Sequence, residues 1–195
     1  MNSLYLRSMA AIACAAGLAA CGGGNSGNLI LGGSVTGLGA KAGLVLTNGS
    51  STLPVAAGSG SFQFVELIDT NANYDVQIKT QPTGAVCTVV SGTGAGKASN
   101  YNVTTVQISC LINQYKLGGT IAGIAGPGLI LLNGKDSVQP TANGAFTFPG
   151  TVGDGSPYGV SMLPSSIPTG KTCTVANPVG TMGSADINNI LVTCS

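Results

Sequence analysis

The chain has 195 residues, of which 44% are hydrophobic and 7% are charged, and its formal net charge is +1. Its lysines are scattered, whereas neutralising the phosphates of a nucleic acid requires clustered Lys and Arg, so we expect no nucleic-acid partner. The sequence contains no histidine, which removes the commonest general base and with it the Ser-His-Asp and Cys-His catalytic arrangements.

Residues 1–20 have the composition of a cleaved signal peptide. Arg7 supplies a positive charge, and residues 9–20 are apolar or small. This run has the length of the hydrophobic part of a signal peptide and is too short to cross a bilayer. The alternatives are an ordinary N-terminal helix or a signal that the general signal peptidase removes.

The residues around Cys21 indicate lipidation. The stretch Leu-Ala-Ala-Cys-Gly at residues 18–22 resembles the lipobox of bacterial lipoproteins, in which the signal is cut before the cysteine and the cysteine carries the lipid. The resemblance implies palmitate or similar acyl chains on Cys21 and, through the glycine after it, the outer membrane. Residues 21–30 begin with a Gly-rich run, which predicts a flexible tether. We therefore expect a lipid-anchored outer-membrane protein that faces the periplasm or the cell surface.

The rest of the sequence is a tandem duplication. Short motifs of Gly, aromatic residues and Cys return in the same order after roughly 84 to 86 residues. The matching positions include Gly32-Gly33 and Gly118-Gly119, Asn48-Gly49 and Asn133-Gly134, Phe62 and Phe146, Phe64 and Phe148, Tyr74 and Tyr158, and Cys87 and Cys173. We expect one domain at residues 31–111 and a second at residues 115–195, joined by residues 111–115.

Each copy reads as short strands separated by turns. In the first copy we expect strands at residues 34–36, 44–47, 61–65, 74–79, 86–90 and 103–110. Val106, Ile108 and Cys110 alternate with polar residues, as in a strand with one buried face. The Asn-Gly pairs predict tight hairpin turns. The pattern predicts an all-β protein made of two tandem sandwiches, either immunoglobulin-like or transthyretin-like.

The cysteines of the two copies predict two disulfides. After Cys21, the sequence has Cys87 and Cys110 in the first copy and Cys173 and Cys194 in the second. An even number per domain in an exported chain favours the pairs Cys87–Cys110 and Cys173–Cys194. The alternative is a metal site, which would need further ligands in a chain without histidine.

The order of these motifs resembles a known repeat. A Gly-Gly pair, Gly-Leu followed by Asn-Gly, then Phe-x-Phe, Tyr-x-Val, Cys-Thr-Val and a closing Cys are similar to a repeat of uncharacterised proteobacterial surface lipoproteins. The resemblance covers residues 31–194, from the first strand to the last cysteine. It implies a two-cysteine β-sandwich, and it supplies no catalytic residue and no cofactor.

One segment could hold a cation. Asp69, Asn71, Asn73 and Asp75 place oxygens at alternating positions, as in the first half of a calcium loop. However, no glycine follows at the sixth position, and Thr80 stands where a bidentate Glu would complete the shell. The alternative is an Asx-rich turn before a strand. We expect the turn, and we expect no metal ion.

The remaining candidates for chemistry are weak. Glu66 and Asp69 are close in sequence, but the acidic residues are distributed as in solvated loops. The Gly-rich residues 92–97 lack the spacing of a phosphate loop and predict a connection between strands. We therefore expect a non-catalytic spacer or adhesive module of the cell envelope. The alternatives are a glycan or small-ligand binding protein that uses residues 69–73 and 153–157, or an accessory subunit of an envelope protein.

Overall fold

A computed structural model describes residues 27–126 and 128–195. The predicted signal peptide, the lipidation site Cys21 and most of the predicted tether lie outside these residues. Within the described ranges, no helix is long and apolar enough to cross a lipid bilayer.

The structure is all-β, as predicted, with one short 3-10 helix at Pro164–Ser166. The strands of the first copy are β1 Leu31–Thr36, β2 Val45–Asn48, β3 Ser51–Pro54, β4 Ser61–Gln63, β5 Asn73–Thr80, β6 Ala85–Val89, β7 Ala95–Lys97 and β8 Val103–Ile112. Those of the second copy are β9 Gln114–Ala122, β10 Leu131–Asn133, β11 Asp136–Val138, β12 Gly144–Gly153, β13 Pro157–Met162, β14 Cys173–Ala176, β15 Val179–Thr181 and β16 Ile187–Cys194.

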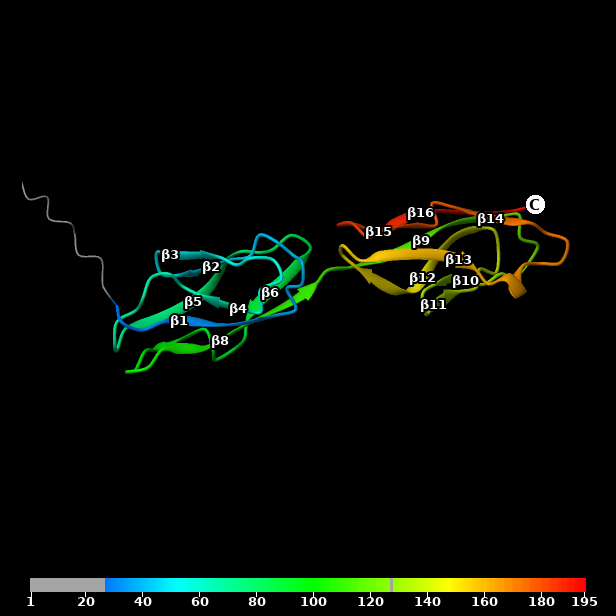
Figure 1. Cartoon of the computed structure of the whole chain (residues 1–195). Coiled ribbons are helices and arrows are strands. Elements are labelled where there is room, and N and C mark those ends of the chain that lie inside the picture. Colours follow the sequence, from blue (N-terminus) through cyan, green and yellow to red (C-terminus); the bar gives the residue numbers. More distant parts are fainter. Residues whose placement is uncertain (1–26, 127) are drawn as a thin grey trace, which may run out of the picture.

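The strands form four sheets of four strands, two in each copy. The first copy contains the sheets β4-β1-β8-β6 and β3-β2-β5-β7, and the second contains β12-β9-β16-β14 and β11-β10-β13-β15. In each copy the first and last strands are parallel neighbours, β1 with β8 and β9 with β16. We call residues 27–112 the first sandwich and residues 114–195 the second sandwich. Figure 1 shows them end to end, with the start of β1 at one end of the molecule and the C-terminus at the other.

Each sandwich encloses its own hydrophobic core. In the first, Leu31 of β1 and Val106 of β8 come from one sheet and Leu46 of β2 from the other, and all three are fully buried. The second core is built in the same way around Leu117, Leu131 and Ile190. The alternation that predicts these faces is borne out in β8, where Val106, Ile108 and Cys110 are buried.

The repeated Gly-Gly pairs have a packing role. A Cβ atom on Gly33 would lie 1.8 Å from the backbone carbonyl oxygen of Val106, and one on Gly119 would lie 1.9 Å from that of Ile190. Both glycines stand beside a register shift in the parallel pairing of the first and last strands. Any side chain here would collide with backbone, so the duplicated glycines are required by the close approach of two strands.

The Asn-Gly pairs form the predicted hairpins. Asn48 pairs with Ser51 at the β2–β3 turn, and Asn133 pairs with Asp136 at the β10–β11 turn. Gly49 and Gly134 adopt φ values of 58° and 60°, in the left-handed region that glycine accepts without a steric penalty.

Four details differ from the prediction. Strands β3 and β7 were not expected, and β7 lies within the Gly-rich run predicted to be only a connection. The predicted connection at 111–115 is reduced to Asn113, because β8 continues to Ile112 and β9 begins at Gln114. The end of the predicted tether belongs to the fold, since Leu29 is buried and pairs with Ile68.

Candidate functional site

The two disulfides link neighbouring strands at the same place in each sandwich. Cys87 of β6 lies directly opposite Cys110 of β8, and Cys173 of β14 lies opposite Cys194 of β16. The Cα–Cα distances are 3.9 and 4.0 Å. Cys87, Cys110 and Cys194 are part of the buried cores. These cysteines therefore join an edge strand to the last strand of each sandwich.

The segment predicted to be a turn or a cation loop forms a turn that leads into a strand. The N–H of Ala72 donates to the carbonyl of Asp69, and Asn71 adopts a φ of 66°. Asn73 and Asp75 lie in β5, where the carboxylate of Asp75 accepts a hydrogen bond from the side chain of Gln77. In the described part of the chain, no three His, Cys, Asp or Glu residues form a group that could hold a metal ion. The Asx-rich turn is the better interpretation.

The second sandwich repeats this turn before β13. Gly155 takes the place of Asn71 with a φ of 74°, and the N–H of Ser156 donates to the carbonyl of Gly153. The N–H of Asn71 donates to the carbonyl of Ala98, and that of Gly155 to the carbonyl of Met182. The two loops offered as ligand-binding candidates are thus equivalent turns at the same end of each sandwich. In the assembled chain they lie in different places, because only the turn of the second sandwich meets the other sandwich.

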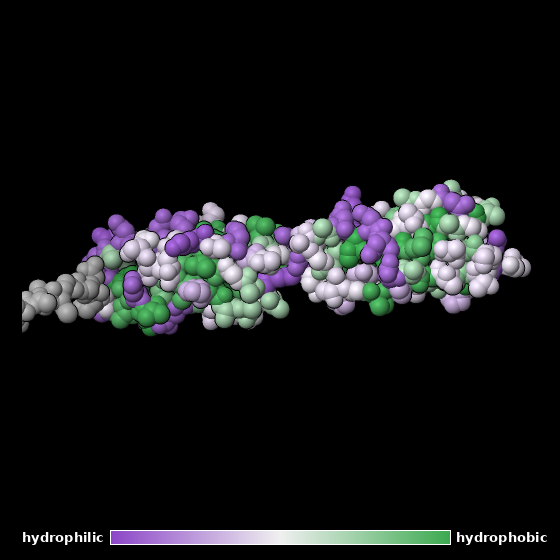
Figure 2. Space-filling view, turned by 90° about the horizontal axis from the view of Figure 1, so that it is seen from above, coloured by the Kyte–Doolittle hydropathy of each residue, from purple (hydrophilic) through white to green (hydrophobic). Residues whose placement is uncertain are grey.

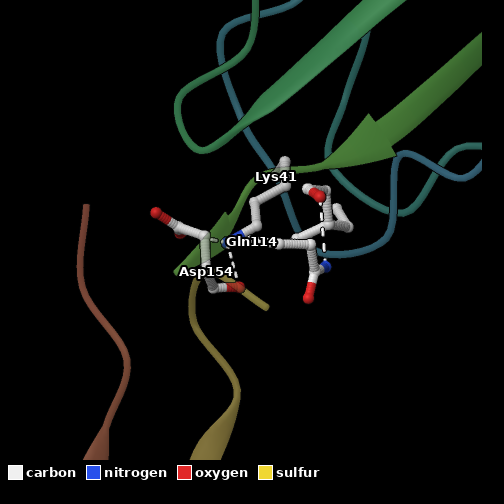
Figure 3. Close-up of polar contacts among 4 residues, drawn as sticks. Lys41, Gln114 and Asp154 are labelled. Carbon is white, nitrogen blue, oxygen red and sulfur yellow. Dashed lines mark hydrogen bonds and ion pairs between the residues drawn. The ribbon is translucent and has the colours of Figure 1, made fainter. Parts of the chain in front are cut away.

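An ion pair joins the two sandwiches at that turn. Lys41, between β1 and β2, donates from its Nζ to the backbone carbonyl of Asp154 at 2.7 Å and to its Oδ1 at 2.5 Å. The side chains are only 14% and 13% exposed, respectively. Figure 3 shows them pointing toward each other across the boundary between the sandwiches. Because both charges are largely removed from water, their attraction is screened less than that of an ordinary surface pair, and loss of one partner would leave the other charge buried without compensation.

Backbone hydrogen bonds cross the same boundary through the single connecting residue. The N–H of Asn113 donates to the carbonyl of Gly84 in the first sandwich, and its carbonyl accepts from the N–H of Asp154 in the second. Gln114 adds a bond from its side chain to the carbonyl of Ile112 (Figure 3). The connection is therefore held on both sides, which restricts rotation about Asn113.

The charged residues of this junction are not duplicated. Thr70 stands in the first sandwich where the second has Asp154, three residues before the strand and one before the left-handed residue. The segment 125–128, which corresponds to the segment of Lys41, contains no lysine. Each charge is present only on the end that faces the other sandwich. Sequence analysis missed both residues, although their failure to repeat was a usable signal.

Two shallow hollows lie elsewhere on the surface. One, of about 390 Å³, is bordered by Ile30, Gly32, Gln63 and Thr104 on the outer side of the sheet that contains β1. The other, of about 440 Å³, is bordered by Asn133, Lys135, Asp136, Gly150 and Thr151. The carboxylate of Asp136 in the second hollow already accepts the N–H groups of Ser137 and Gly150. Among the residues that the structure describes, no titratable side chain borders the first hollow, and in the second Lys135 stands beside this structurally engaged Asp136.

The polar groups of the described residues are satisfied structurally. No polar or charged residue in these ranges is fully buried, and no buried side-chain nitrogen or oxygen lacks a hydrogen-bond partner. No protein-family model matches the chain, and no curated protein sequence is similar to it. Among the candidate sites, the junction of Lys41, Asn113 and Asp154 combines an ion pair with backbone hydrogen bonds to both sandwiches.

Proposed function

We propose that the protein is a lipid-anchored spacer of the bacterial cell envelope, held in the outer membrane through Cys21 and without catalytic activity. The observation that carries the proposal is the end-to-end arrangement of two duplicated sandwiches with one connecting residue (Figure 1). The predicted lipid lies before the first sandwich in the chain, whereas the C-terminus lies at the far end of the second. Such a protein holds its distal end away from the membrane.

The junction supports this proposal because a spacer must resist bending. A flexible Gly-rich linker would let the second sandwich move freely. Here the strands β8 and β9 follow one another with only Asn113 between them, and Asn113 is hydrogen-bonded to both sandwiches. The ion pair of Lys41 and Asp154 adds a contact away from the chain connection. Two separated points of attachment restrain bending more than one.

The connectivity favours a transthyretin-like rather than an immunoglobulin-like sandwich. In immunoglobulin domains the first two strands belong to one sheet. In both copies here the first two strands belong to different sheets, β1 apart from β2 and β9 apart from β10. We therefore propose the transthyretin-like alternative for both sandwiches.

Metabolic labelling with a fatty-acid analogue tests the anchor. The full chain and a Cys21→Ala variant are expressed in a Gram-negative host, and label and membrane fractionation are compared. We expect label and outer-membrane recovery for the unchanged chain only. Equal labelling of both proteins would contradict the anchor. Turnover of any substrate that is lost when Glu66 or Asp69 is substituted would contradict the non-catalytic function.

A further inference from the structure

The topology brings three segments to the end of the first sandwich where the chain enters the fold. Strand β4 is antiparallel to β1, so the residues after β4 lie beside the start of β1. Strand β8 is parallel to β1, so the residues before β8 lie at the same end. The hydrogen bonds between Leu29 and Ile68, and from the N–H of Ile30 to the side chain of Asn102, hold these segments together.

Large apolar side chains are exposed at this end. Val65 and Leu67 follow β4 and are 89% and 41% exposed, and Tyr101 precedes β8 and is 80% exposed. Figure 2 shows hydrophobic surface at this end of the first sandwich. Isolated apolar residues are common on protein surfaces, but a group of them at one place indicates a contact with another apolar phase.

The second sandwich provides an internal control for this group. Its matching residues are Pro149 for Val65, Thr151 for Leu67 and Ala185 for Tyr101. The match rests on equivalent contacts, because Tyr115 pairs with Val152 as Leu29 pairs with Ile68, and Asp186 accepts the N–H of Lys116 as Asn102 accepts that of Ile30. The fold is thus built without large apolar side chains at these positions. Their presence in the first sandwich calls for a reason other than folding.

We infer that Val65, Leu67 and Tyr101 dock the first sandwich on the lipid bilayer that holds the acyl chains of Cys21. The inference rests on the proposed function, because it needs the anchor. Only residues 22–26 separate Cys21 from Gly27, so the two Cα atoms are at most about 22 Å apart. The end that carries the three side chains is therefore kept next to the membrane surface, where Tyr places its ring among the lipids and its hydroxyl in water.

The charges at this end indicate which lipid headgroups are suitable for docking. Glu66 and Asp69 are both exposed beside the apolar group, and the exposed Lys97, which pairs with Asn73 after the Asp69 turn, offsets one of the two negative charges. Negative side chains are repelled by anionic lipids, so docking depends on the insertion of apolar side chains rather than on electrostatic attraction. Zwitterionic phosphatidylethanolamine–phosphatidylcholine vesicles are accordingly the appropriate probe.

A single tryptophan tests the docking directly, because the chain contains none. The full-length lipidated protein with Tyr101→Trp is reconstituted into these vesicles, with and without brominated acyl chains. The matched control is Ala185→Trp at the equivalent position of the second sandwich. We expect the emission of the first variant to shift to shorter wavelength and to be quenched by brominated lipid. The tryptophan emission of the control should be the same in vesicles with and without brominated acyl chains.

A second pair of substitutions tests the apolar group while the tryptophan reporter is kept in place. Val65→Ser with Leu67→Ser, added to Tyr101→Trp, should reduce the quenching, and since both residues are exposed, intact disulfides and circular dichroism should show an unchanged fold. Lipidated protein whose tryptophan is not quenched would overturn the docking and leave the anchor standing. A blue shift without quenching would also overturn it, in favour of a protein or a second copy covering this end. Absence of lipid on Cys21 would remove both proposals.

Discussion

The turn before β5 and the turn before β13 share one backbone conformation but have different surroundings. Asn71 and Gly155 both adopt left-handed φ values. Their N–H groups donate to equivalent carbonyls, that of Ala98 just after β7 and that of Met182 just after β15. In the second sandwich, Asp154 of this turn contacts Lys41 and Asn113 of the neighbouring part of the chain. In the first sandwich the same end carries the exposed Val65 and its apolar neighbours instead.

This difference teaches where the specialised residues of a duplicated protein lie. The cores, disulfides and hairpins are repeated, because both copies need them to fold. The residues at the ends are not repeated, because each end meets a different neighbour. Gly155, which stands where the first copy has Asn71, follows this rule, since a Cβ on it would lie 2.8 Å from Nζ of Lys41.

The largest effects are expected from features that both copies need, among them the glycines of the first strands and the disulfides. Gly33→Ala should destabilise the first sandwich, and Gly119→Ala the second, by about 3 kcal/mol, because the new Cβ would collide with a backbone carbonyl. Calorimetry combined with hydrogen exchange of each sandwich measures the loss. Gly60→Ala and Gly183→Ala are the controls, since no atom lies within 4 Å of the added Cβ. A loss shared equally by both sandwiches would contradict separate cores.

The disulfides should contribute equally to the two copies. They close segments with sequence separations of 23 and 21 residues, and stabilisation varies only with the logarithm of that length, so each double Cys→Ala variant should lose about 3 kcal/mol. Urea unfolding of the variants Cys87→Ala/Cys110→Ala and Cys173→Ala/Cys194→Ala gives both values. A strongly unequal pair of losses would show that the sandwiches differ in more than their ends.

The junction should respond to loss of its cation. Lys41→Met leaves the largely buried carboxylate of Asp154 without its partner and should weaken the contact between the sandwiches by about 1.5 kcal/mol. Residual dipolar couplings of the unlipidated Cys21→Ala protein measure the relative orientation of the sandwiches. We expect the two sandwiches to share one alignment tensor before the substitution and to have two different tensors after it. Lys79→Met, on an exposed position of β5, is the control, and an identical response of the two variants would contradict a role for the ion pair.

The smallest effect is expected from exchanging the left-handed residues of the two turns. Asn71→Gly should change the stability by less than about 0.5 kcal/mol, since either residue tolerates this conformation. Gly155→Asn keeps the conformation but places a Cβ against Lys41, so it should weaken the junction by about 0.5 to 1 kcal/mol. Thermal unfolding measures the stability of the two variants, and the same dipolar couplings measure the relative orientation of their sandwiches. A greater loss for Asn71→Gly would reverse the comparison.

Much of the fold could be predicted because its signals are local or repeated. The alternation of Val106, Ile108 and Cys110 identifies a buried face, and the two Asn-Gly pairs identify hairpins. Strand β7 could not be predicted in this way, since Ala95, Gly96 and Lys97 are all exposed and have no alternation. It exists because Asn73, Tyr74 and Asp75 of β5 supply the partners for its backbone.

The two junction residues can be singled out because neither is repeated, but their pairing could not be predicted from the sequence. Lys41 and Asp154 are separated by 113 residues, and each stands alone among small or polar residues, where a charge usually indicates a solvated surface. Only the way two sandwiches abut brings them together. The alternative of a cation loop at residues 69–75 arose in the opposite way, because alternating oxygens in the sequence resemble a ligand set although Asn73 and Asp75 lie in strand β5.

Neutron reflectometry of the full-length lipidated protein on a supported zwitterionic bilayer tests the spacer most directly. We expect a protein layer as thick as two sandwiches placed end to end, with its inner edge in contact with the lipid headgroups. Lys41→Met should broaden the outer edge of this layer, because the second sandwich is then less firmly held. A layer as thick as a single sandwich, unchanged by Lys41→Met, would contradict a rigid spacer.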